Sequence, residues 1–352
     1  MTPRRSRVTS VDVARHAGVS QSAVSRALSP GKAAVSVALR LRVLASAKAL
    51  GYRPNAHARS LSSGRSRIVA LLFSYLDNPF YALALEKLCL GLQAEGHHAL
   101  VFLEPDTTSG VEREVADLLD YRVDGIITAS VELGSTITDE CRAYGIPVVM
   151  FNRLREDPDL SSVTTDNVTG GRLAAAHLLD IGRRNIAILA GWEGASTNRD
   201  REWGFAAELA ARGQSVFARA VGHFDPVRAA AATRDLFDCQ PAERPDALFA
   251  VNDYMAFPAM SVLRHELGIR VPDDVAVVGF DDVPLASAPE YTLTSVRQPL
   301  GQMVEHAIRF ILRRMNDPAP ERVALAPLLV VRGSTSMKPD RWRRQTTLAR
   351  RR

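Results

Sequence analysis

Residues Val8–Leu28 read VTSVDVARHAGVSQSAVSRAL, and their spacing predicts two short helices joined by a tight turn. Thr9 suits the N-cap of the first helix, and Asp12 lies three residues later, where its carboxylate can reach back to a free backbone N–H. Gly18 tolerates the left-handed conformation that such a turn requires. The stretch therefore predicts a helix-turn-helix.

The second helix, expected from about Ser20 to Leu28, has an apolar side and a polar side. Val24 and Ala27 are spaced to lie on the inner side together with Leu28. The outer side carries four side chains suited to base edges in a major groove: Gln21, Ser22, Ser25 and Arg26. An amphipathic helix pair with a solvated outer face is the alternative interpretation of this stretch alone.

The charge of the chain is unevenly distributed, which favours a nucleic-acid partner for its N-terminal part. Residues 1–65 carry twelve Lys and Arg and one acid, whereas residues 66–337 carry 25 basic and 37 acidic residues. A basic head on an acidic body is typical of a protein that binds nucleic acid. A third helix, expected from about Ser36 to Leu50, would complete the head. The basic tail, residues 338–352, is expected to be disordered, or else to contact phosphates weakly.

A short segment follows the head. Pro54 and Asn55 would start a helix that ends near Ser62. Isolated helices shorter than about 12–15 residues are marginal in water, so this segment should be helical only when it packs against something. Leu61 is its one large apolar side chain. It is either part of a simple linker or a wedge between base steps of a minor groove.

From Ile68 onward, short apolar runs alternate with longer amphipathic stretches. Strands are expected over residues 68–73, 98–103, 125–130, 147–151, 185–191, 215–221, 247–253 and 275–282. This alternation predicts parallel sheets covered by helices on both faces. The strands divide into two halves near residues 160–165, and the interface between two such lobes is a common place for a small ligand.

Other classes of protein do not fit the sequence. It has no apolar run of about eighteen residues, and no apolar stretch follows the basic N-terminus, so we expect neither a membrane span nor a secretory signal. Cys89, Cys141 and Cys239 are too far apart for a zinc pattern or a disulfide framework, which favours a reducing cytoplasm. Nucleotide-binding and hydrolase motifs are missing, so we expect no enzyme, no metal and no cofactor.

Eight motifs in order resemble the LacI/GalR family of bacterial transcription regulators: VTSVDVARHAGVSQSAVSRAL, ALGYRPNAHARSL, DNPFY, FNR, TTDN..GG.LAAAHL, VNDYMA, VPDDVAVVGFDD and LTSVRQP. The resemblance covers about residues 7–336 and implies a homodimer. It implies a helix-turn-helix head (1–53), a hinge helix and linker (54–65) and a two-lobed core of the type I periplasmic-binding-protein fold (66–337). The N-lobe would comprise about 66–164 and 295–325, and the C-lobe about 165–292 and 326–337.

The resemblance also implies roles for residues that would contact DNA. Gln21, Ser22 and Arg26 match the family's base-contacting positions. Leu61 matches its minor-groove lever. Phosphate contacts are expected from Ser20, Ser25, Asn55 and Arg59. Ala23 and Leu39 stand where the family usually has Thr, which should weaken backbone contact without abolishing binding.

Positions that match the family's effector site are Phe80, Tyr81, Thr197, Arg201, Phe224, Asn252 and Asp281. Paired donors, paired acceptors and flat apolar faces together suit a polyhydroxylated ring such as a sugar. Trp192 could add another face. Ala195 stands where some purine-binding members have Arg, which argues mildly against a purine.

The sequence therefore predicts a cytoplasmic, nucleoid-associated repressor that binds a pseudo-palindromic operator and is controlled by a small effector, a sugar. Three alternatives stay open: a regulator that needs a non-sugar corepressor, a solute-binding protein with the same core fold, and a sugar-modifying α/β enzyme.

Overall fold

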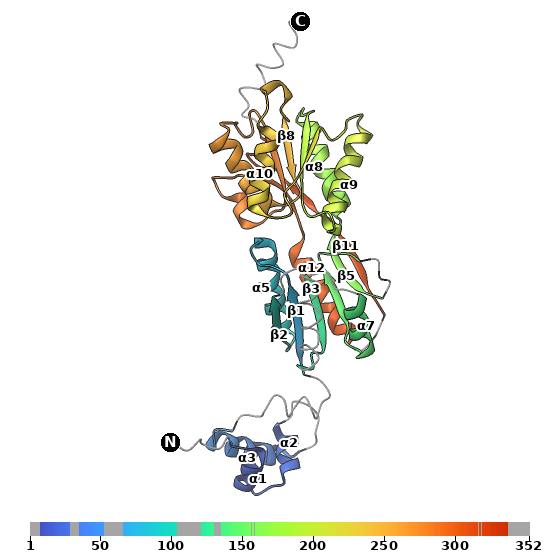
Figure 1. Cartoon of the computed structure of the whole chain (residues 1–352). Helices are drawn as coiled ribbons and strands as arrows, with labels where there is room; N and C mark the ends of the chain where they lie inside the picture. The colour runs from blue at the N-terminus through green and yellow to red at the C-terminus, as the bar shows by residue number, and fades with distance from the viewer. Residues whose placement is uncertain are drawn as a thin grey trace. The chain divides into compact units, whose positions relative to one another are not determined.

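The computed structural model describes residues 8–28, 35–52, 66–103, 121–129, 135–155, 157, 159–315, 317 and 319–336. They belong to two compact units that divide between Arg67 and Ile68, and each unit is described by itself (Figure 1). Within these ranges, none of the helices has the length and apolar character needed to cross a membrane.

The described residues of the first unit form three helices, α1 (Ser10–Ala17), α2 (Gln21–Leu28) and α3 (Val37–Ala49). Thr9 and Asp12 form the expected capping box, in which Asp12 Oδ2 accepts a 2.9 Å hydrogen bond from the Thr9 backbone N–H. Gly18 has a φ of 62°, the left-handed conformation expected of the turn. The core of this unit is formed by small apolar side chains from all three helices: Val13, Ala14, Ala17, Val24, Ala27, Val43 and Ala47. The predicted helix-turn-helix is confirmed.

The first lobe of the second unit is built on a six-stranded sheet with the order β11-β5-β4-β3-β1-β2, in which all neighbours are parallel. Its strands are β1 (Ile68–Phe73), β2 (His98–Leu103), β3 (Gly125–Ala129), β4 (Val148–Phe151), β5 (Ser161–Thr165) and β11 (Arg322–Leu325). Its helices are α5 (Pro79–Ala94), α7 (Ser135–Ala143) and α12 (Leu300–Arg314).

Both faces of this sheet are covered. Val69 and Leu71 of β1 belong to the cluster that contains the buried side chains of α5 and α12, whereas Ala70 and Leu72 pack in a second cluster with Cys141 of α7. A parallel strand buried on both faces is apolar throughout, which explains the unbroken run IVALLF.

The second lobe is built on another six-stranded sheet, with the order β12-β10-β9-β8-β6-β7. Its strands are β6 (Ile186–Ala190), β7 (Ala218–Val221), β8 (Ala247–Ala250), β9 (Ala276–Asp281), β10 (Thr294–Arg297) and β12 (Leu328–Val330), of which β12 alone pairs antiparallel. Its helices are α8 (Asn167–Asp180), α9 (Ser196–Ala211), α10 (Pro226–Phe237) and α11 (Asp253–Ser261), with a π-helical turn at Val262–Glu266 and 3-10 turns at Pro241–Glu243 and Pro284–Ser287.

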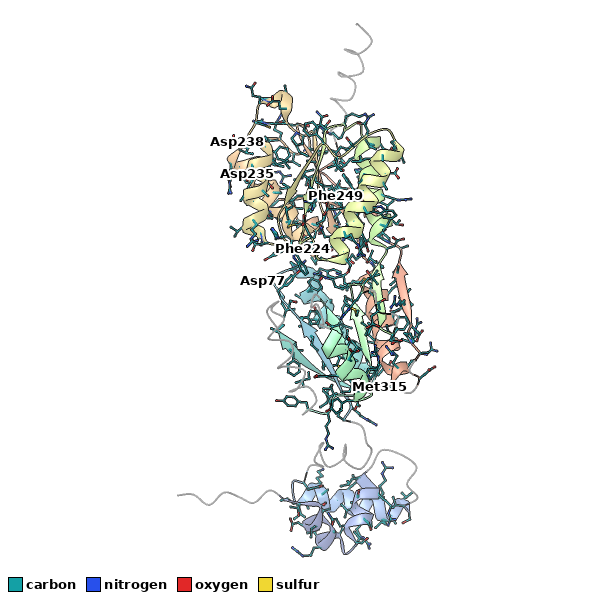
Figure 2. The ribbon with its side chains drawn as sticks, turned by 45° about the vertical axis from the view of Figure 1, so that its right-hand side comes forward. Asp77, Phe224, Asp235, Asp238, Phe249 and Met315 are labelled. Carbon is teal, nitrogen blue, oxygen red and sulfur yellow. The ribbon has the colours of Figure 1, made fainter. Side chains whose placement is uncertain are left out.

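Figure 1 shows α8 and α9 on one side of this second sheet and α10 on the other. In the interior, Phe249 of β8 stacks on Phe205 of α9 with their ring centres 4.8 Å apart (Figure 2). The two parallel-sheet lobes expected from the sequence are therefore confirmed.

The chain passes between the two sheets three times: after β5 at Asp166, after β10 at residues 298–299, and between β11 and β12 at residues 326–327. The second passage differs from the sequence expectation, which ended the C-lobe segment at residue 292 and restarted the N-lobe at 295. β10 still pairs in parallel with β9 of the second sheet, so the boundary lies after Arg297.

Candidate functional site

The polar face of α2 is exposed as the sequence analysis expected. All five described DNA-contact candidates lie on the exposed surface of the first unit: Ser20, Gln21, Ser22, Ser25 and Arg26. Gln21 Nε2 donates a 3.0 Å hydrogen bond to Ser10 Oγ, which fixes this side chain against α1. Ser20 Oγ accepts a hydrogen bond from the Ala23 backbone N–H and so also caps α2. Asn55, Arg59 and Leu61 lie outside the described residues.

The two family departures occupy packed positions in the first unit. Ala23 is buried, and Leu39 is half-buried against the apolar core of the three helices.

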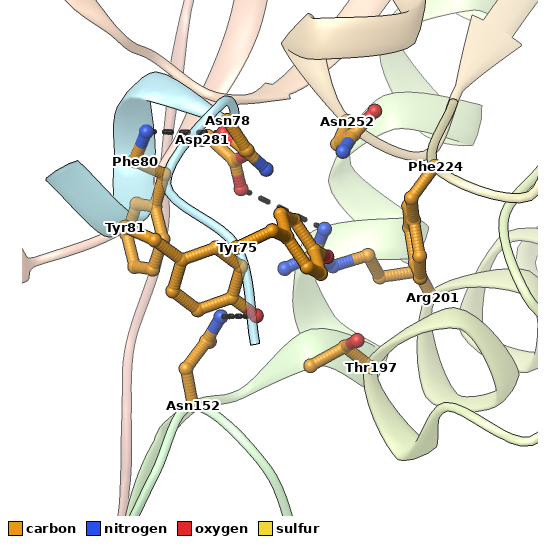
Figure 3. A pocket seen from close by; sticks show the side chains of 10 residues that line it. All are labelled: Tyr75, Asn78, Phe80, Tyr81, Asn152, Thr197, Arg201, Phe224, Asn252 and Asp281. Atoms are coloured by element: carbon orange, nitrogen blue, oxygen red, sulfur yellow. Dashed lines mark hydrogen bonds and ion pairs between the residues drawn. The ribbon is translucent and has the colours of Figure 1, made fainter. Parts of the chain in front are cut away.

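A pocket lies between the two lobes of the second unit, at the ends of their strands (Figure 3). Its lining residues are Tyr75, Asn78, Phe80, Tyr81, Asn152, Thr197, Arg201, Phe224, Asn252 and Asp281. The structure brings together all seven effector-site candidates of the sequence analysis. Figure 2 shows Phe224 at the end of the second lobe that is nearest Asp77 of the first lobe. Ligands of parallel α/β sheets bind at the carboxyl ends of strands, which is where these residues lie.

Three lining residues were missed by the sequence analysis. Tyr75 and Asn78 follow β1, and Asn152 follows β4. Asn78 caps α5 by accepting a hydrogen bond from the Phe80 N–H, and Asn152 donates a 3.4 Å hydrogen bond to the Tyr81 hydroxyl. Their signals in the sequence were the motifs DNPFY and FNR, which contain Asn78 and Asn152, and the position of Tyr75 shortly after an apolar strand. Trp192 does not line the pocket; the guanidinium of Arg153 lies 5.8 Å from its ring centre.

Arg201 and Asp281 form a buried ion pair in this pocket. Nη1 of Arg201 lies 3.6 Å from Oδ1 of Asp281, and each side chain is 3% exposed. The guanidinium lies 3.6 Å from the ring centre of Phe280 and donates a 2.6 Å hydrogen bond to the Val251 carbonyl. Removal of either partner would leave an uncompensated buried charge.

Two buried carboxyls of the second lobe, Asp281 and Asp253, have raised pKa values. Burial raises the pKa of Asp281 to about 6, although the Arg201 charge and the hydrogen bond from Gln298 act to lower it. Burial and the nearby Asp281 raise the pKa of Asp253 well above its usual range. Asp253 accepts hydrogen bonds from the Ser295 hydroxyl and the Val283 N–H, which hold it in the interior.

Backbone conformations that are rare for side-chain-bearing residues occur at the pocket. Asn152 and Phe224 each have a φ of 60°, and Asp281 has a φ of 114°. Such conformations concentrate at functional sites, because the surrounding structure must hold them. A Cβ at Gly191 would lie 2.3 Å from the Phe224 ring, so only glycine at this position leaves room for the ring.

The lining side chains leave little room inside the pocket. The space open to the centre of a water-sized sphere is about 10 Å³, which is about what one water needs. Figure 3 shows the Tyr75 ring in the midst of the other lining side chains. A ligand of sugar size therefore requires these side chains, or the lobes, to move apart.

Comparison with known families gives two matches. Residues 9–55 match the family described as bacterial regulatory proteins, lacI family. Residues 175–335 match the periplasmic binding protein-like domain.

Curated relatives match over nearly the whole chain. The HTH-type transcriptional regulator CelR of Thermobifida fusca is 35% identical over 94% of this chain and 99% of its own length. The ribose operon repressor of Escherichia coli (strain K12) is 31% identical over 93% of this chain and 99% of its own length.

Solved structures are also similar over nearly the whole chain. The lac repressor dimer bound to operator and the anti-inducer ONPF is 26% identical with a TM-score of 0.85, covering 94% of this chain and 100% of that one. The CelR-cellobiose complex is 32% identical with a TM-score of 0.70, covering 93% of this chain and 100% of that one.

Proposed function

The chain belongs to the lacI family of bacterial regulatory proteins, and from this membership we propose that it is a repressor whose operator affinity is controlled by a sugar bound between its lobes. The observation that carries the proposal is the buried set of Arg201, Asp281 and Asn252 beside the Phe224 ring. A guanidinium offers paired donors, a carboxylate paired acceptors and an aromatic ring an apolar face. A sugar ring presents hydroxyls and apolar faces that complement this set.

Asn252 adds directed donors to the pocket. Its Oδ1 accepts a 3.0 Å hydrogen bond from the Met255 N–H as the N-cap of α11, which leaves its amide nitrogen for a ligand. Two relatives support a sugar by name, the ribose operon repressor and the regulator solved as a CelR-cellobiose complex. Ala195, the buried N-cap residue of α9, supports a sugar over a purine as the sequence analysis argued.

For DNA, we assign base contacts to Gln21, Ser22 and Arg26 and phosphate contacts to Ser20 and Ser25. Asn55 and Arg59 are proposed as further phosphate contacts and Leu61 as the minor-groove lever, in a hinge over residues 54–65 between a head of residues 1–53 and a core of residues 66–337. Arg26 is exposed, and no described residue is a hydrogen-bond partner of its guanidinium, so its donors are available to a guanine.

We further propose that two copies bind the operator together, at the nucleoid. β2 is an edge strand of the first sheet and exposes Val101 and Leu103, and Leu90 of α5 is also exposed. An edge strand with exposed apolar side chains favours association with a second copy. Each of the two copies would then place its α2 in one half of a pseudo-palindromic site. Sugar binding would rotate one lobe on the other and so change the spacing of the two hinge segments.

The test selects an operator from a randomised duplex pool with the full chain, and then measures operator affinity with and without cellobiose or ribose at moderate salt. A sugar at one hundred times its dissociation constant should stabilise the core by about 2.7 kcal/mol and change operator affinity. The direction of that change separates an inducer from a corepressor.

Failure to prefer any duplex over random competitor would overturn the proposal. If the protein binds a sugar but prefers no operator, the solute-binding alternative is favoured. Chemical conversion of the sugar would favour the enzyme alternative.

A further inference from the structure

We propose that Thr165, Asn167 and Gln298 form a buried hydrogen-bonded relay that joins the two charged residues of the pocket to the places where the chain passes between the lobes. This inference rests on the proposed function, because it takes Arg201 and Asp281 as effector-binding residues. The relay makes these three residues positioning residues for the control of operator affinity by the effector.

One arm of the relay starts at Arg201. Its Nε donates a 2.8 Å hydrogen bond to Asn167 Oδ1. This contact orients the Asn167 amide, since the oxygen must face the guanidinium. Asn167 Nδ2 then donates to the Thr165 carbonyl at 3.0 Å and to Thr164 Oγ1 at 3.2 Å. The first arm therefore leads from the pocket to the first passage between the lobes.

The other arm starts at Asp281. Gln298 Nε2 donates a 2.7 Å hydrogen bond to Asp281 Oδ1, so the oxygen of the Gln298 amide faces away from the carboxylate. That oxygen accepts a 2.6 Å hydrogen bond from Thr165 Oγ1. Because Gln298 lies between β10 and α12, the second arm joins the second passage to the first.

The two arms close into a ring. Arg201 contacts Asn167, Asn167 contacts Thr165, Thr165 contacts Gln298, and Gln298 contacts Asp281, which lies 3.6 Å from Arg201. The third passage is attached to the same place, since the Asp166 backbone N–H donates a 2.8 Å hydrogen bond to the Leu325 carbonyl. All three passages between the lobes are thus bonded to residues 165–167 or 298.

Burial makes the ring act as a unit. Thr165, Asn167 and Gln298 are 1%, 4% and 3% exposed. Buried polar atoms are nearly always hydrogen-bonded, and a buried network that loses one bond is costly, so its members respond together. A ligand that takes over the bonds of Arg201 and Asp281 therefore changes what Asn167 and Gln298 can bond to. These residues then shift with the passages that set the angle between the lobes.

The test uses a matched pair of substitutions in the full chain, Thr165→Val and Thr233→Val. Both hydroxyls are buried and each donates one short hydrogen bond, from Thr165 to Gln298 at 2.6 Å and from Thr233 to the Ala229 carbonyl at 2.7 Å. Only the first belongs to the ring. Thr165→Ser keeps the hydroxyl and is the rescue variant.

Operator affinity is measured with and without saturating cellobiose or ribose, and sugar affinity with and without operator. Coupling between two sites is commonly about 5–150-fold and equal in both directions. Thr165→Val should reduce the coupling factor towards one, both for the effect of sugar on operator affinity and for the effect of operator on sugar affinity. Its sugar dissociation constant in the absence of DNA should stay within about threefold of that of the unchanged protein. Thr233→Val and Thr165→Ser should keep the coupling.

The relay is overturned if the Thr165→Val protein has the same coupling factor as the unchanged protein. It is also overturned if Thr233→Val reduces the coupling factor as much as Thr165→Val does. If the unchanged protein itself responds to neither sugar, the proposed function fails together with the relay.

Discussion

Oδ1 of Asp281 lies 3.6 Å from Nη1 of Arg201, while the same oxygen accepts a 2.7 Å hydrogen bond from Gln298. The two charges of the pocket are thus held in place by protein partners before a ligand arrives. A ligand must offer both donors and acceptors to replace these contacts. A site built to hydrogen-bond its ligand rejects analogues that lack those groups, because its buried polar atoms would be left unpaired.

Arg201→Lys should weaken sugar binding at least about tenfold, or about 1.4 kcal/mol. Lysine keeps the charge but replaces a planar fork by a single ammonium, so it cannot bond a ligand and Asn167 in the same geometry. Calorimetric titration with the sugar measures the loss. Arg219→Lys is the control, because Arg219 pairs with Glu202 and Glu193 at the surface, away from the pocket. Equal weakening in both variants would show that the fork of Arg201 has no special role.

The stability of the core should depend on pH through Asp281. Its pKa is raised from 3.8 to about 6 in the folded state, mainly by burial. A carboxyl of this kind stabilises the fold fully below about pH 4 and loses that contribution as pH rises to about 6. Two pKa units correspond to about 3 kcal/mol.

The measurement is urea unfolding of the unchanged protein and of Asp281→Asn between pH 4 and 7, followed by tryptophan fluorescence, since Trp192 and Trp203 both lie in the second lobe. The difference in unfolding free energy between the two proteins should fall by about 2 to 3 kcal/mol across this range. A constant difference would place the pKa of Asp281 near its ordinary value.

Gly204→Ala should destabilise the second lobe by about 1–3 kcal/mol through overpacking. A Cβ at Gly204 would lie 2.0 Å from the carbonyl oxygen of Val168, where α8 and α9 are in contact, and backbone cannot yield as a side chain does. Gly301→Ala is the control, since nothing lies within 4 Å of a Cβ at this position near the start of α12. Chemical unfolding compares the two, and a Gly204→Ala protein as stable as the Gly301→Ala protein would contradict the close approach of these helices.

The sequence predicted eight strands from their apolar runs and missed four others, β5, β10, β11 and β12. β5 reads SSVTT, and it is buried because its hydroxyls find partners inside the protein, as Thr165 does with Gln298. β10, β11 and β12 are only three or four residues long and lie near the lobe boundary. β10 and β11 each include an arginine, and β12 has only three residues, too few to show a period, so tertiary contacts decide these strands.

The pocket was predictable only in part for a similar reason. Motifs that resemble the family located residues such as Arg201 and Asp281, and the structure brings them together. Tyr75 and Asn152 became visible as lining residues only when both lobes were in place. Gln298 lies 133 residues from Thr165 in the chain, so no local pattern could have joined them.

Arg26→Ala should cost about 1–3 kcal/mol of operator affinity and relax the preference at one base position in each half-site. Arg26 is exposed on α2, the helix whose inner side is held by Val24 and Ala27, so its removal should leave the fold of the first unit intact. Arg15→Ala is the control: Arg15 is also exposed, on α1, but pairs with Asp12, and a surface pair of this kind contributes little. Competition binding with operator duplexes substituted at each position measures both the loss and the relaxation. A uniform weakening over all sequences would assign Arg26 to a phosphate, because only a base contact makes the loss depend on the base it reads.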